Sequence, residues 1–586
     1  FRERRRLFKK SRSSWTDYDP QRISKGGGVF SRQEKTIPLS PEIQAWLGLE
    51  QDRMAPNALI RTLLKAPVDL LWNGGIGTYV KASGETHADV GDLANNPLRV
   101  NGSELRCRVI GEGGNLGLTQ RGRIEFARAG GRVNTDFIDN SAGVDTSDHE
   151  VNIKILLNLA MRAGELKPEA RPALMAEMTD EVARMVLRSN YLQTQAITMM
   201  EEFSPSRLGA KQHFISILED QGLLNRELEF LPSEDELKER RDRGEGLTRP
   251  ELAVLLSYSK ITLYQQLLDS DVPEDAWLSD EAKSYFPGPL RERFADLLPQ
   301  HRLKREIIAT QVTNSLVNRM GASFALRMHE DTGATPGEVA RAYSIAREVF
   351  RARDFWSKIE ALDNKVSTQL QTAAMLAMWR LLRQASRWLL NLQGRKLDIR
   401  AMVERLAPGL AEVQRSIRQS MATDELESLQ RQMQPYIDGG FPRKLAEQTA
   451  MLDRLFPTLD VVETAARRRS DVERIAQVFF GLGDALELKW LRRQVEALDV
   501  VGQWHAMSRA NLRDELFTQH NRLVERVLQA DGRKRDPVGA WIADNAERVG
   551  LVQKMLRDMR NLAEMDYPTI AVAVRSLGQL AEDTAP

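Results

Sequence analysis

Residues 106–115 read RCRVIGEGGN, and residues 68–77 read VDLLWNGGIG. In both stretches a short apolar run leads directly into glycines and an asparagine, which is typical of a buried strand that ends in a tight loop. Helical windows lie near them, at residues 56–64 and 119–129. Strands and helices that alternate through glycine-rich loops predict an open α/β sheet for the first part of the chain.

The pattern changes near residue 153. From there on glycine is rarer, and apolar residues recur at helical spacing over long segments. Thr335 and Glu338 stand three residues apart with a proline after the threonine, which is the capping-box pattern of a helix start. We therefore predict an α/β domain with a partial, open Rossmann-like sheet at residues 1–152. A large all-α domain at residues 153–586 follows it, so the chain is predicted to be predominantly helical.

The composition is that of a globular protein, because 42% of the 586 residues are hydrophobic and 28% are charged. The 83 Lys and Arg residues nearly balance the 82 Asp and Glu residues, which leaves a formal net charge of +1. Such a chain has no overall field that attracts nucleic acid or an anionic membrane, and we expect neither partner. The basic opening, from Arg2 to Arg12, is expected to form an amphipathic surface helix.

Cys107 is the single cysteine of the sequence. It excludes an internal disulfide and a multi-cysteine metal site, and it fits a cytoplasmic protein. No run of about 18 apolar residues suggests a membrane span. The sequence opens on Phe1 within a basic stretch rather than on methionine, so we expect a fragment of a longer protein.

Three polar turns form the candidate binding site. The third turn follows an apolar pair at residues 137–138, which we interpret as the end of another strand. An asparagine amide offers both a donor and an acceptor, and glycine lets a ligand approach the backbone, so the turns suit a flat amide or a ribose. Taken singly, each turn is more often only structural. The candidate cofactor-binding residues are Asn73, Gly74, Gly113, Gly114, Asn115 and Asn140.

Ser147 lies in a polar stretch that leads into a helix expected to begin near residue 151. Two interpretations stay open: Ser147 caps this helix, or it donates to a substrate carboxylate held at the helix N-terminus. The neighbouring Asp148, His149 and Glu150 point in different directions on a helix start, so we expect no metal site. Neither a P-loop ending in Gly-Lys-Ser/Thr nor a GxGxxG dinucleotide fingerprint after a strand occurs in the sequence.

The sequence VIGEGGN at residues 109–115 and the sequence NSAGV at residues 140–144, with Ser147 three residues later, resemble the second half of the cofactor domain of glutamate dehydrogenases. Two further stretches resemble the large bacterial NAD-specific members of that family. They are DLLWNGGIGTYVK at residues 69–81 and LTRPELAVLLSYSK at residues 247–260. The resemblance extends over essentially the whole chain.

This resemblance implies oxidative deamination of L-glutamate to 2-oxoglutarate and ammonia, with hydride transfer to NAD. It places Asn115 and Asn140 near the ribose and the nicotinamide carboxamide, Asn73 along the cofactor cleft, and Ser147 at the distal carboxylate of glutamate. The catalytic Lys and Asp of the family, and its glycine fingerprint, are expected upstream of Phe1. No catalytic residue is therefore assigned, and the chain alone is expected to be inactive.

A long amphipathic array of helices needs partners for its apolar edges, so we also expect a homo-oligomer, either a tetramer or a hexamer. One alternative stays open because most of the chain is predicted to be helical. In that alternative the protein is a non-catalytic helical scaffold or oligomerisation module, and the three glycine-rich turns are structural.

Overall fold

The computed structural model describes the chain except for residues 393–396, 417–420, 422, 501, 531–533, 563 and 583–586. The described residues divide into two compact units, whose segments alternate along the sequence. The first unit consists of Phe1–Ser206, Leu218–Tyr258 and Phe286–Arg302, and the second consists of Arg207–Ile217, Ser259–Tyr285 and Leu303–Pro586. The predicted boundary between residues 152 and 153 falls within a helix, and it stays a prediction.

The first unit contains every strand of the described chain, in three two-stranded pieces. Strands β3 (Leu70–Asn73) and β6 (Val109–Glu112) pair in parallel, with Asn73 opposite Glu112. Strands β4 (Val80–Lys81) and β5 (Val100–Asn101) also pair in parallel, whereas β1 (Ile37–Pro38) and β2 (Arg53–Met54) pair antiparallel. The prediction of strands at the two apolar runs is confirmed, and the structure pairs them in parallel.

The helices of the first unit include both helical windows predicted from the sequence. Helix α3 (Pro56–Leu64) and helix α5 (Gln120–Arg128) lie where they were expected, and the side chain of Thr119 caps α5. Phe126 of α5 packs with Ile110 of β6 in the hydrophobic core of this region. The other helices here are α1 (Arg2–Lys9), α2 (Pro41–Leu47), α4 (His87–Val90), α6 (Asp136–Asp139), α7 (Ser141–Arg162), α8 (Arg171–Glu202), α10 (Glu234–Asp242) and α13 (Gly288–Arg293).

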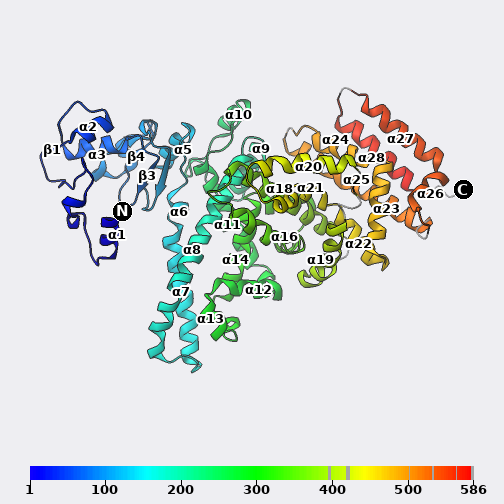
Figure 1. Ribbon diagram of the computed structural model, residues 1–586, viewed down its shortest axis with the longest axis horizontal. Helices are drawn as coiled ribbons and strands as arrows, with labels where there is room; N and C mark the ends of the chain where they lie inside the picture. The colour runs from blue at the N-terminus through cyan, green and yellow to red at the C-terminus, as the bar shows by residue number, and fades with distance from the viewer. Residues whose placement is uncertain are drawn as a thin grey trace. The chain divides into compact units, whose positions relative to one another are not determined.

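Two local predictions between residues 136 and 151 are wrong. Residues 137–138 lie in the short helix α6 and not in a strand, and α7 begins at Ser141 rather than near residue 151. A short apolar pair does not distinguish a strand from a helix. Helix α8 packs beside α6 and α7 (Figure 1) and supports them through contacts that the local sequence does not contain.

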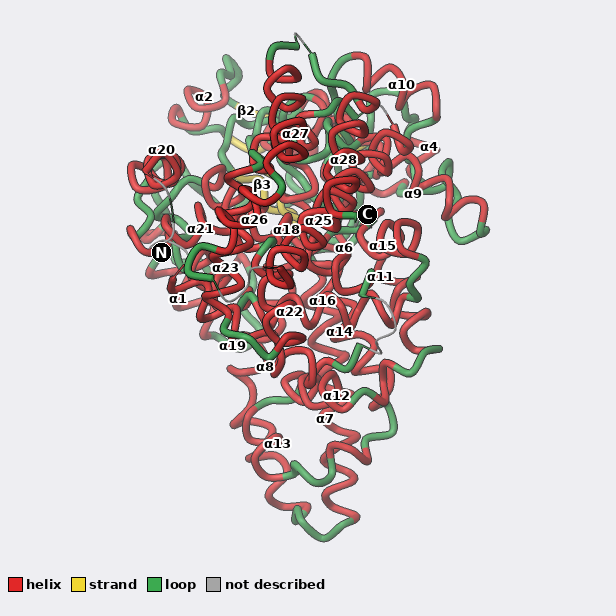
Figure 2. Tube along the Cα trace, turned by 90° about the vertical axis from the view of Figure 1, so that its right-hand side faces the viewer, coloured by secondary structure: helices red, strands yellow, loops and turns green. Residues whose placement is uncertain are grey.

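The second unit consists entirely of helices and loops in its described residues, and helices dominate the whole described chain (Figure 2). Helices α9 (Leu208–Asp220) and α11 (Arg249–Leu268) each run from one unit's residues into the other's. The prediction of a predominantly helical α/β chain is confirmed. The remaining helices are α12 (Ala276–Ala282), α14 (Lys304–Met320), α15 (Phe324–Thr332), α16 (Pro336–Val349), α17 (Ala352–Glu360), α18 (Thr368–Leu390), α19 (Ile399–Ser416), α20 (Thr423–Asp438), α21 (Arg443–Leu455), α22 (Thr458–Arg468), α23 (Val472–Ala485), α24 (Leu488–Ala497), α25 (Gly502–Ala530), α26 (Pro537–Asp544), α27 (Ala546–Arg560) and α28 (Tyr567–Ala581).

The start of α16 shows why the helices of this unit could be predicted. The hydroxyl of Thr335 accepts a hydrogen bond from the backbone N–H of Glu338, and the carboxylate of Glu338 accepts one from the backbone N–H of Thr335. Gly333 ends the preceding helix in a left-handed conformation, with φ of 71°. Both signals are local in sequence, and the capping-box prediction is confirmed.

Candidate functional site

The first two predicted turns meet at the carboxyl ends of β3 and β6. The backbone carbonyl of Asn73 accepts hydrogen bonds from the N–H groups of Gly113 at 2.8 Å and Gly114 at 3.2 Å. A side chain at position 114 would overlap the backbone carbonyl of Gly75, so only glycine lets the two turns approach each other this closely. The two turns therefore form one rigid edge.

The third turn joins this edge through an amide pair. The side-chain NH₂ of Asn140 donates to the side-chain oxygen of Asn115 at 2.9 Å. Asn140 is also the residue that precedes the first turn of α7. The structure thus brings Asn73, Gly113, Gly114, Asn115 and Asn140 together along one edge, with Gly74 in the turn beside Asn73.

Two aspartates of α6 hold the third turn against β6. The backbone N–H of Glu112 donates to the carboxylate of Asp139 at 3.0 Å, and the backbone N–H of Leu116 donates to Asp136 at 2.8 Å. Burial raises the pKa of Asp139, against the lowering effects of Asn134, which donates to it, and of nearby backbone and arginine groups. These two carboxylates position the turn, although the sequence reasoning assigned them no role.

Asn190 of α8 provides the second support for this turn. Its side-chain NH₂ donates to the carbonyl oxygen of Ile138 at 2.7 Å and to the hydroxyl of Ser141 at 2.9 Å. It therefore joins the end of α6 to the start of α7. Asn190 lies about 50 residues from its partners in sequence, so no local pattern could have identified it.

An ion pair under the edge fixes β6 to α5. The carboxylate of Glu112 is 0% exposed, and it accepts hydrogen bonds from Arg123 Nε at 2.6 Å and Nη2 at 2.9 Å. The backbone N–H of Leu118 donates to the same carboxylate. Burial raises the pKa of Glu112, and the Arg123 guanidinium opposes that rise. Because both partners are buried and hydrogen-bonded, the pair is a structural clamp.

Ser147 does not cap a helix, so the interpretation of Ser147 as a helix cap is wrong. It lies exposed in the second turn of α7, and its hydroxyl donates to the carbonyl of Gly143 at 3.4 Å. The first N–H groups of α7 are those of residues 141 and 142, next to Asn140, whereas the N–H of Gly143 donates to the carbonyl of Asn140 at 3.1 Å. The positive end of the helix dipole therefore lies at the asparagine edge, and Ser147 lies one helical turn from it.

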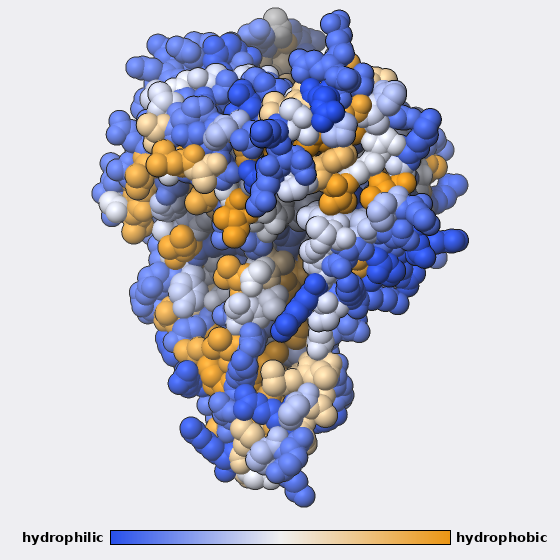
Figure 3. All heavy atoms as spheres, turned by 90° about the vertical axis from the view of Figure 1, so that its left-hand side faces the viewer, coloured by the Kyte–Doolittle hydropathy of each residue, from blue (hydrophilic) through white to orange (hydrophobic). Residues whose placement is uncertain are grey.

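Large apolar side chains surround the edge and remain exposed. The exposed fraction is 62% for Trp72, 95% for Ile76 and 64% for Leu116, and Val144 of α7 is also exposed. Figure 3 shows that hydrophobic side chains reach the surface in several separate patches. Exposed apolar groups around a polar edge are typical of a surface that contacts another molecule or another part of a protein.

Comparison with known proteins assigns the family. The model described as "Glutamate dehydrogenase, C-terminal" matches residues 244–579, and the model described as "Bacterial NAD-glutamate dehydrogenase, catalytic domain" matches residues 1–200. The chain belongs to the bacterial NAD-glutamate dehydrogenase family. The resemblance inferred from the sequence is therefore confirmed.

Curated relatives align along the whole chain. Proteins named NAD-specific glutamate dehydrogenase from Halomonas elongata and Pseudomonas aeruginosa are each 45% identical to it over 100% of its length. One of the same name from Mycobacterium tuberculosis is 38% identical over 99%. The chain spans 36% of the length of each of these three relatives.

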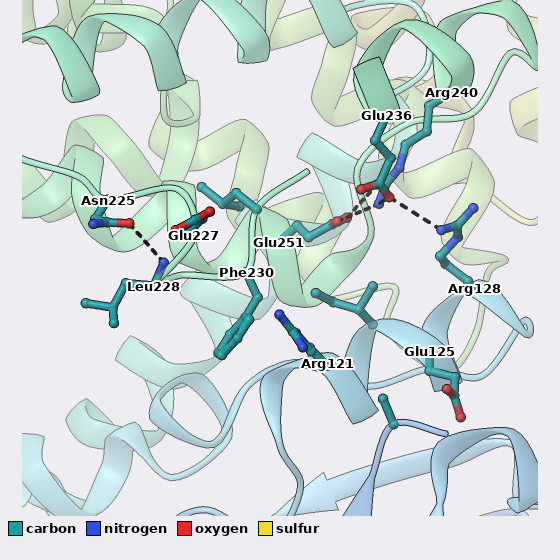
Figure 4. Close-up of a pocket in the computed structure, with 13 residues that line it drawn as sticks. Arg121, Glu125, Arg128, Asn225, Glu227, Leu228, Phe230, Glu236, Arg240 and Glu251 are labelled. Carbon is teal, nitrogen blue, oxygen red and sulfur yellow. Dashed lines mark hydrogen bonds and ion pairs between the residues drawn. The ribbon is translucent and has the colours of Figure 1, made fainter. Parts of the chain in front are cut away.

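A pocket of about 960 Å³ lies elsewhere in the first unit, between α5, α10 and the segment at residues 225–231 (Figure 4). Arg121 of α5 lies over the ring of Phe230 there, with 4.8 Å between guanidinium carbon and ring centroid. At the other end, Arg240 pairs with Glu236 and with the buried Glu251. None of the predicted site residues lines this pocket.

Two further features concern the described part of the chain. It contains no group of three or more His, Cys, Asp or Glu side chains placed to hold a metal ion. None of its helices combines the length and the apolar composition needed to cross a bilayer.

Proposed function

We propose that this chain forms one wall of an NAD-binding cleft in an enzyme that oxidatively deaminates L-glutamate to 2-oxoglutarate and ammonia. The observation that carries the proposal is the asparagine edge at the carboxyl ends of the parallel strands β3 and β6. Open α/β sheets bind their ligands at that end of the strands. The names of the relatives that align with the whole chain support the same reaction.

The asparagine edge has the donor and acceptor groups that a nicotinamide carboxamide needs. The bond between Asn140 and Asn115 uses one amide donor and one amide acceptor, which leaves the carbonyl of Asn140 and the NH₂ of Asn115 for a ligand. Open space surrounds Gly75 on the side where a side chain would stand. When bound, NAD supplies the hydride acceptor, and the residues of this edge orient it.

The N-terminus of α7 offers a site for a carboxylate of glutamate. Its dipole and the N–H groups of residues 141 and 142 favour an anion there, and Ser147 carries a hydroxyl one turn further along. The bond of that hydroxyl to the carbonyl of Gly143 is long, at 3.4 Å, so rotation toward a carboxylate costs little. No residue of this chain is assigned a proton-transfer role.

Substitutions in the protein that carries these 586 residues test the proposal. Asn140→Ala removes a neutral hydrogen bond to the cofactor, so we expect the KM for NAD to rise about 2- to 10-fold. Ser147→Ala removes a bond to a carboxylate, so the KM for glutamate should rise about 10-fold or more while the KM for NAD stays unchanged. Steady-state kinetics with each substrate varied in turn measures both effects.

Asn57 of α3 provides a matched control, because it is an exposed asparagine in the same unit. Asn57→Ala should leave every kinetic constant as in the parent protein. The proposal fails if Asn140→Ala and Ser147→Ala also leave KM and kcat unchanged. That outcome would favour the helical-scaffold alternative.

We also propose a cytoplasmic homo-oligomer, a tetramer or a hexamer, that binds neither nucleic acid nor membranes. The balanced charge and the single buried thiol of Cys107 support the absence of polyanionic partners and a reducing compartment. Exposed apolar residues of the second unit, such as Trp504 and Leu551, support contacts between copies.

A further inference from the structure

Arg249, the first residue of α11, is linked to the third turn of the asparagine edge by hydrogen bonds. The guanidinium Nε of Arg249 donates to the side-chain oxygen of Asn134 at 3.0 Å, and the side-chain NH₂ of Asn134 donates to Asp139 at 2.8 Å. The other carboxylate oxygen of Asp139 accepts a hydrogen bond from the backbone N–H of Glu112 in β6. Three side chains therefore form a continuous chain of hydrogen bonds from α11 to the end of β6.

Arg249 determines the orientation of the Asn134 amide in this chain. The amide NH₂ faces a carboxylate, and the amide oxygen faces a guanidinium. An amide rotated by half a turn would place its oxygen against Asp139 and its NH₂ against Arg249, and both contacts would be repulsive. Arg249 thus selects the orientation in which Asn134 donates to Asp139.

The guanidinium of Arg249 is itself held in place. Its side chain is 14% exposed, and its Nη1 donates to the hydroxyl of Thr198 at 3.1 Å and to the carboxylate of Glu201 at 2.8 Å, both on α8. The backbone of Arg249 is fixed as well, because the carboxylate of Glu251 accepts hydrogen bonds from the backbone N–H and the hydroxyl of Thr248. Arg249 can therefore act as a rigid support.

The charge of Arg249 also acts on Asp139. Burial raises the pKa of Asp139, and the hydrogen bonds that this carboxylate accepts lower it. The positive charge of Arg249 lowers it further. An ionised carboxylate accepts hydrogen bonds at both oxygens, whereas a protonated one turns one oxygen into a donor. Arg249 therefore favours the form of Asp139 that holds both Asn134 and Glu112.

Arg249 is distant in sequence from the residues that it supports. It stands 115 positions after Asn134, in the segment that matches the C-terminal model, whereas Asn134 and Asp139 lie in the segment that matches the catalytic-domain model. All three residues belong to the first unit, and α11 continues beyond Tyr258 with residues of the second unit. The C-terminal segment thus supplies a support for the third turn that the catalytic segment does not contain.

We propose that Arg249 is a positioning residue that keeps Asn140 in place for NAD. It acts through Asn134 and Asp139, and Asp139 directly precedes Asn140 in the sequence. This role rests on the proposed function, because it requires NAD to bind at the asparagine edge. In this way the start of the C-terminal segment takes part in cofactor binding without contacting the cofactor.

Steady-state kinetics of the protein that carries these 586 residues tests the proposal. Arg249→Met removes both the donor and the charge, so the KM for NAD should rise about 2- to 10-fold, and no more than in Asn140→Ala. The KM for glutamate should stay within about 2-fold of the parent value, because Asn190 supports the start of α7 independently. Arg249→Lys keeps the charge and one donor group, so its KM for NAD should lie between those of the parent and Arg249→Met.

A double variant shows whether Arg249 acts through Asn140. If it does, adding Arg249→Met to Asn140→Ala should raise the KM for NAD no further than Asn140→Ala alone. A merely structural role of Arg249 predicts instead that the two effects multiply and that the KM for glutamate rises as well. Multiplying effects would overturn the proposal.

Arg293 of α13 is the matched control. It belongs to the same unit and, like Arg249, it pairs with a glutamate of α8, because its guanidinium lies 3.0 Å from the carboxylate of Glu177. Arg293→Met therefore removes an arginine bound to α8 without removing the link to Asn134. It should leave the KM for NAD as in the parent protein.

Hydrogen exchange separates a failure of this role from a failure of the proposed function. Mass spectrometry of the peptides that cover residues 109–118 and 134–143 should show faster exchange in Arg249→Met than in the parent or in Arg293→Met. Arg249 is not a positioning residue if exchange is unchanged, or if its KM for NAD is unchanged while that of Asn140→Ala rises. If Asn140→Ala itself leaves the KM for NAD unchanged, the proposed function fails, and the role of Arg249 in cofactor binding fails with it.

Discussion

Buried charges behave differently in the two regions of this molecule. In the first unit, Glu112 and Arg123 are both buried, and each satisfies the other through two hydrogen bonds. In the second unit, Lys211 is 8% exposed, and no side chain of the described residues forms an ion pair with it. Burial of a charge is therefore not in itself a sign of function. The informative feature is whether the protein compensates the charge that it buries.

The buried ion pair of Glu112 and Arg123 gives the largest expected effect on stability. Arg123→Met leaves the carboxylate of Glu112 buried without its partner, so we expect the free energy of unfolding of the first unit to fall by about 3–5 kcal/mol. Native-state hydrogen exchange of the β6 and α5 amides measures this loss. Adding Glu112→Gln to the variant should recover part of the stability, because it removes the uncompensated charge.

Arg128, which lies exposed on the same helix, is the control for that experiment. Its ion pairs with Glu236 and Glu245 are long, at 3.5 and 3.7 Å. Arg128→Met should therefore change the stability by less than about 1 kcal/mol. If Arg123→Met costs no more than this control, the pair under the asparagine edge is not a clamp.

The strands and the helix around the pair of Glu112 and Arg123 were also easier to predict, because the sequence signals for them are local. The apolar runs that end in Asn73 and in Glu112 predicted strands β3 and β6. Thr119 caps α5, and its position in the sequence indicated where that helix begins. In each case the residues that determine the element adjoin it in sequence. The meeting of the first two turns followed from the rule that carboxyl ends of parallel strands share one edge, whereas the third turn follows helix α6 and not a strand.

Features that depend on distant residues could not be predicted. The start of α7 at Ser141 depends on Asn190 of α8, and the local sequence through His149 is too polar to indicate a helix. The burial of Lys211 is a second feature of this kind, because the side chain is only 8% exposed. Lysine is a common surface residue, so only the fold shows that this one is enclosed.

Lys211 of the second unit gives the next largest effect, a dependence of the free energy of unfolding on pH. Burial lowers the pKa of Lys211 to about 7 in the folded chain, so above that pH the unfolded chain binds more protons than the folded one. The free energy of unfolding should therefore rise between about pH 7 and 9, by up to about 1.4 kcal/mol per pH unit. Lys211→Met should lack this rise. Urea denaturation of both chains at several pH values measures the difference.

Besides burial, the charge of Arg207, four residues earlier, lowers the pKa of Lys211. His213 of the same helix pairs with Glu330 and serves as the control, so His213→Gln should keep the rise. Parallel pH curves for the parent chain and Lys211→Met would contradict the assignment.

The smallest effect comes from a charge of the same kind on the surface. Lys358 of α17 has a 49% exposed side chain, and its ammonium lies 2.7 Å from the carboxylate of Asp354 one turn earlier. Water screens such a pair, so Lys358→Met should change the free energy of unfolding by about 0.5 kcal/mol or less, with no dependence on pH between about 7 and 9. Urea denaturation under the conditions used for Lys211→Met checks both points. A pH-dependent change here would mean that the response attributed to Lys211 belongs to lysines of this unit in general, and the contrast between enclosed and exposed charge would no longer hold.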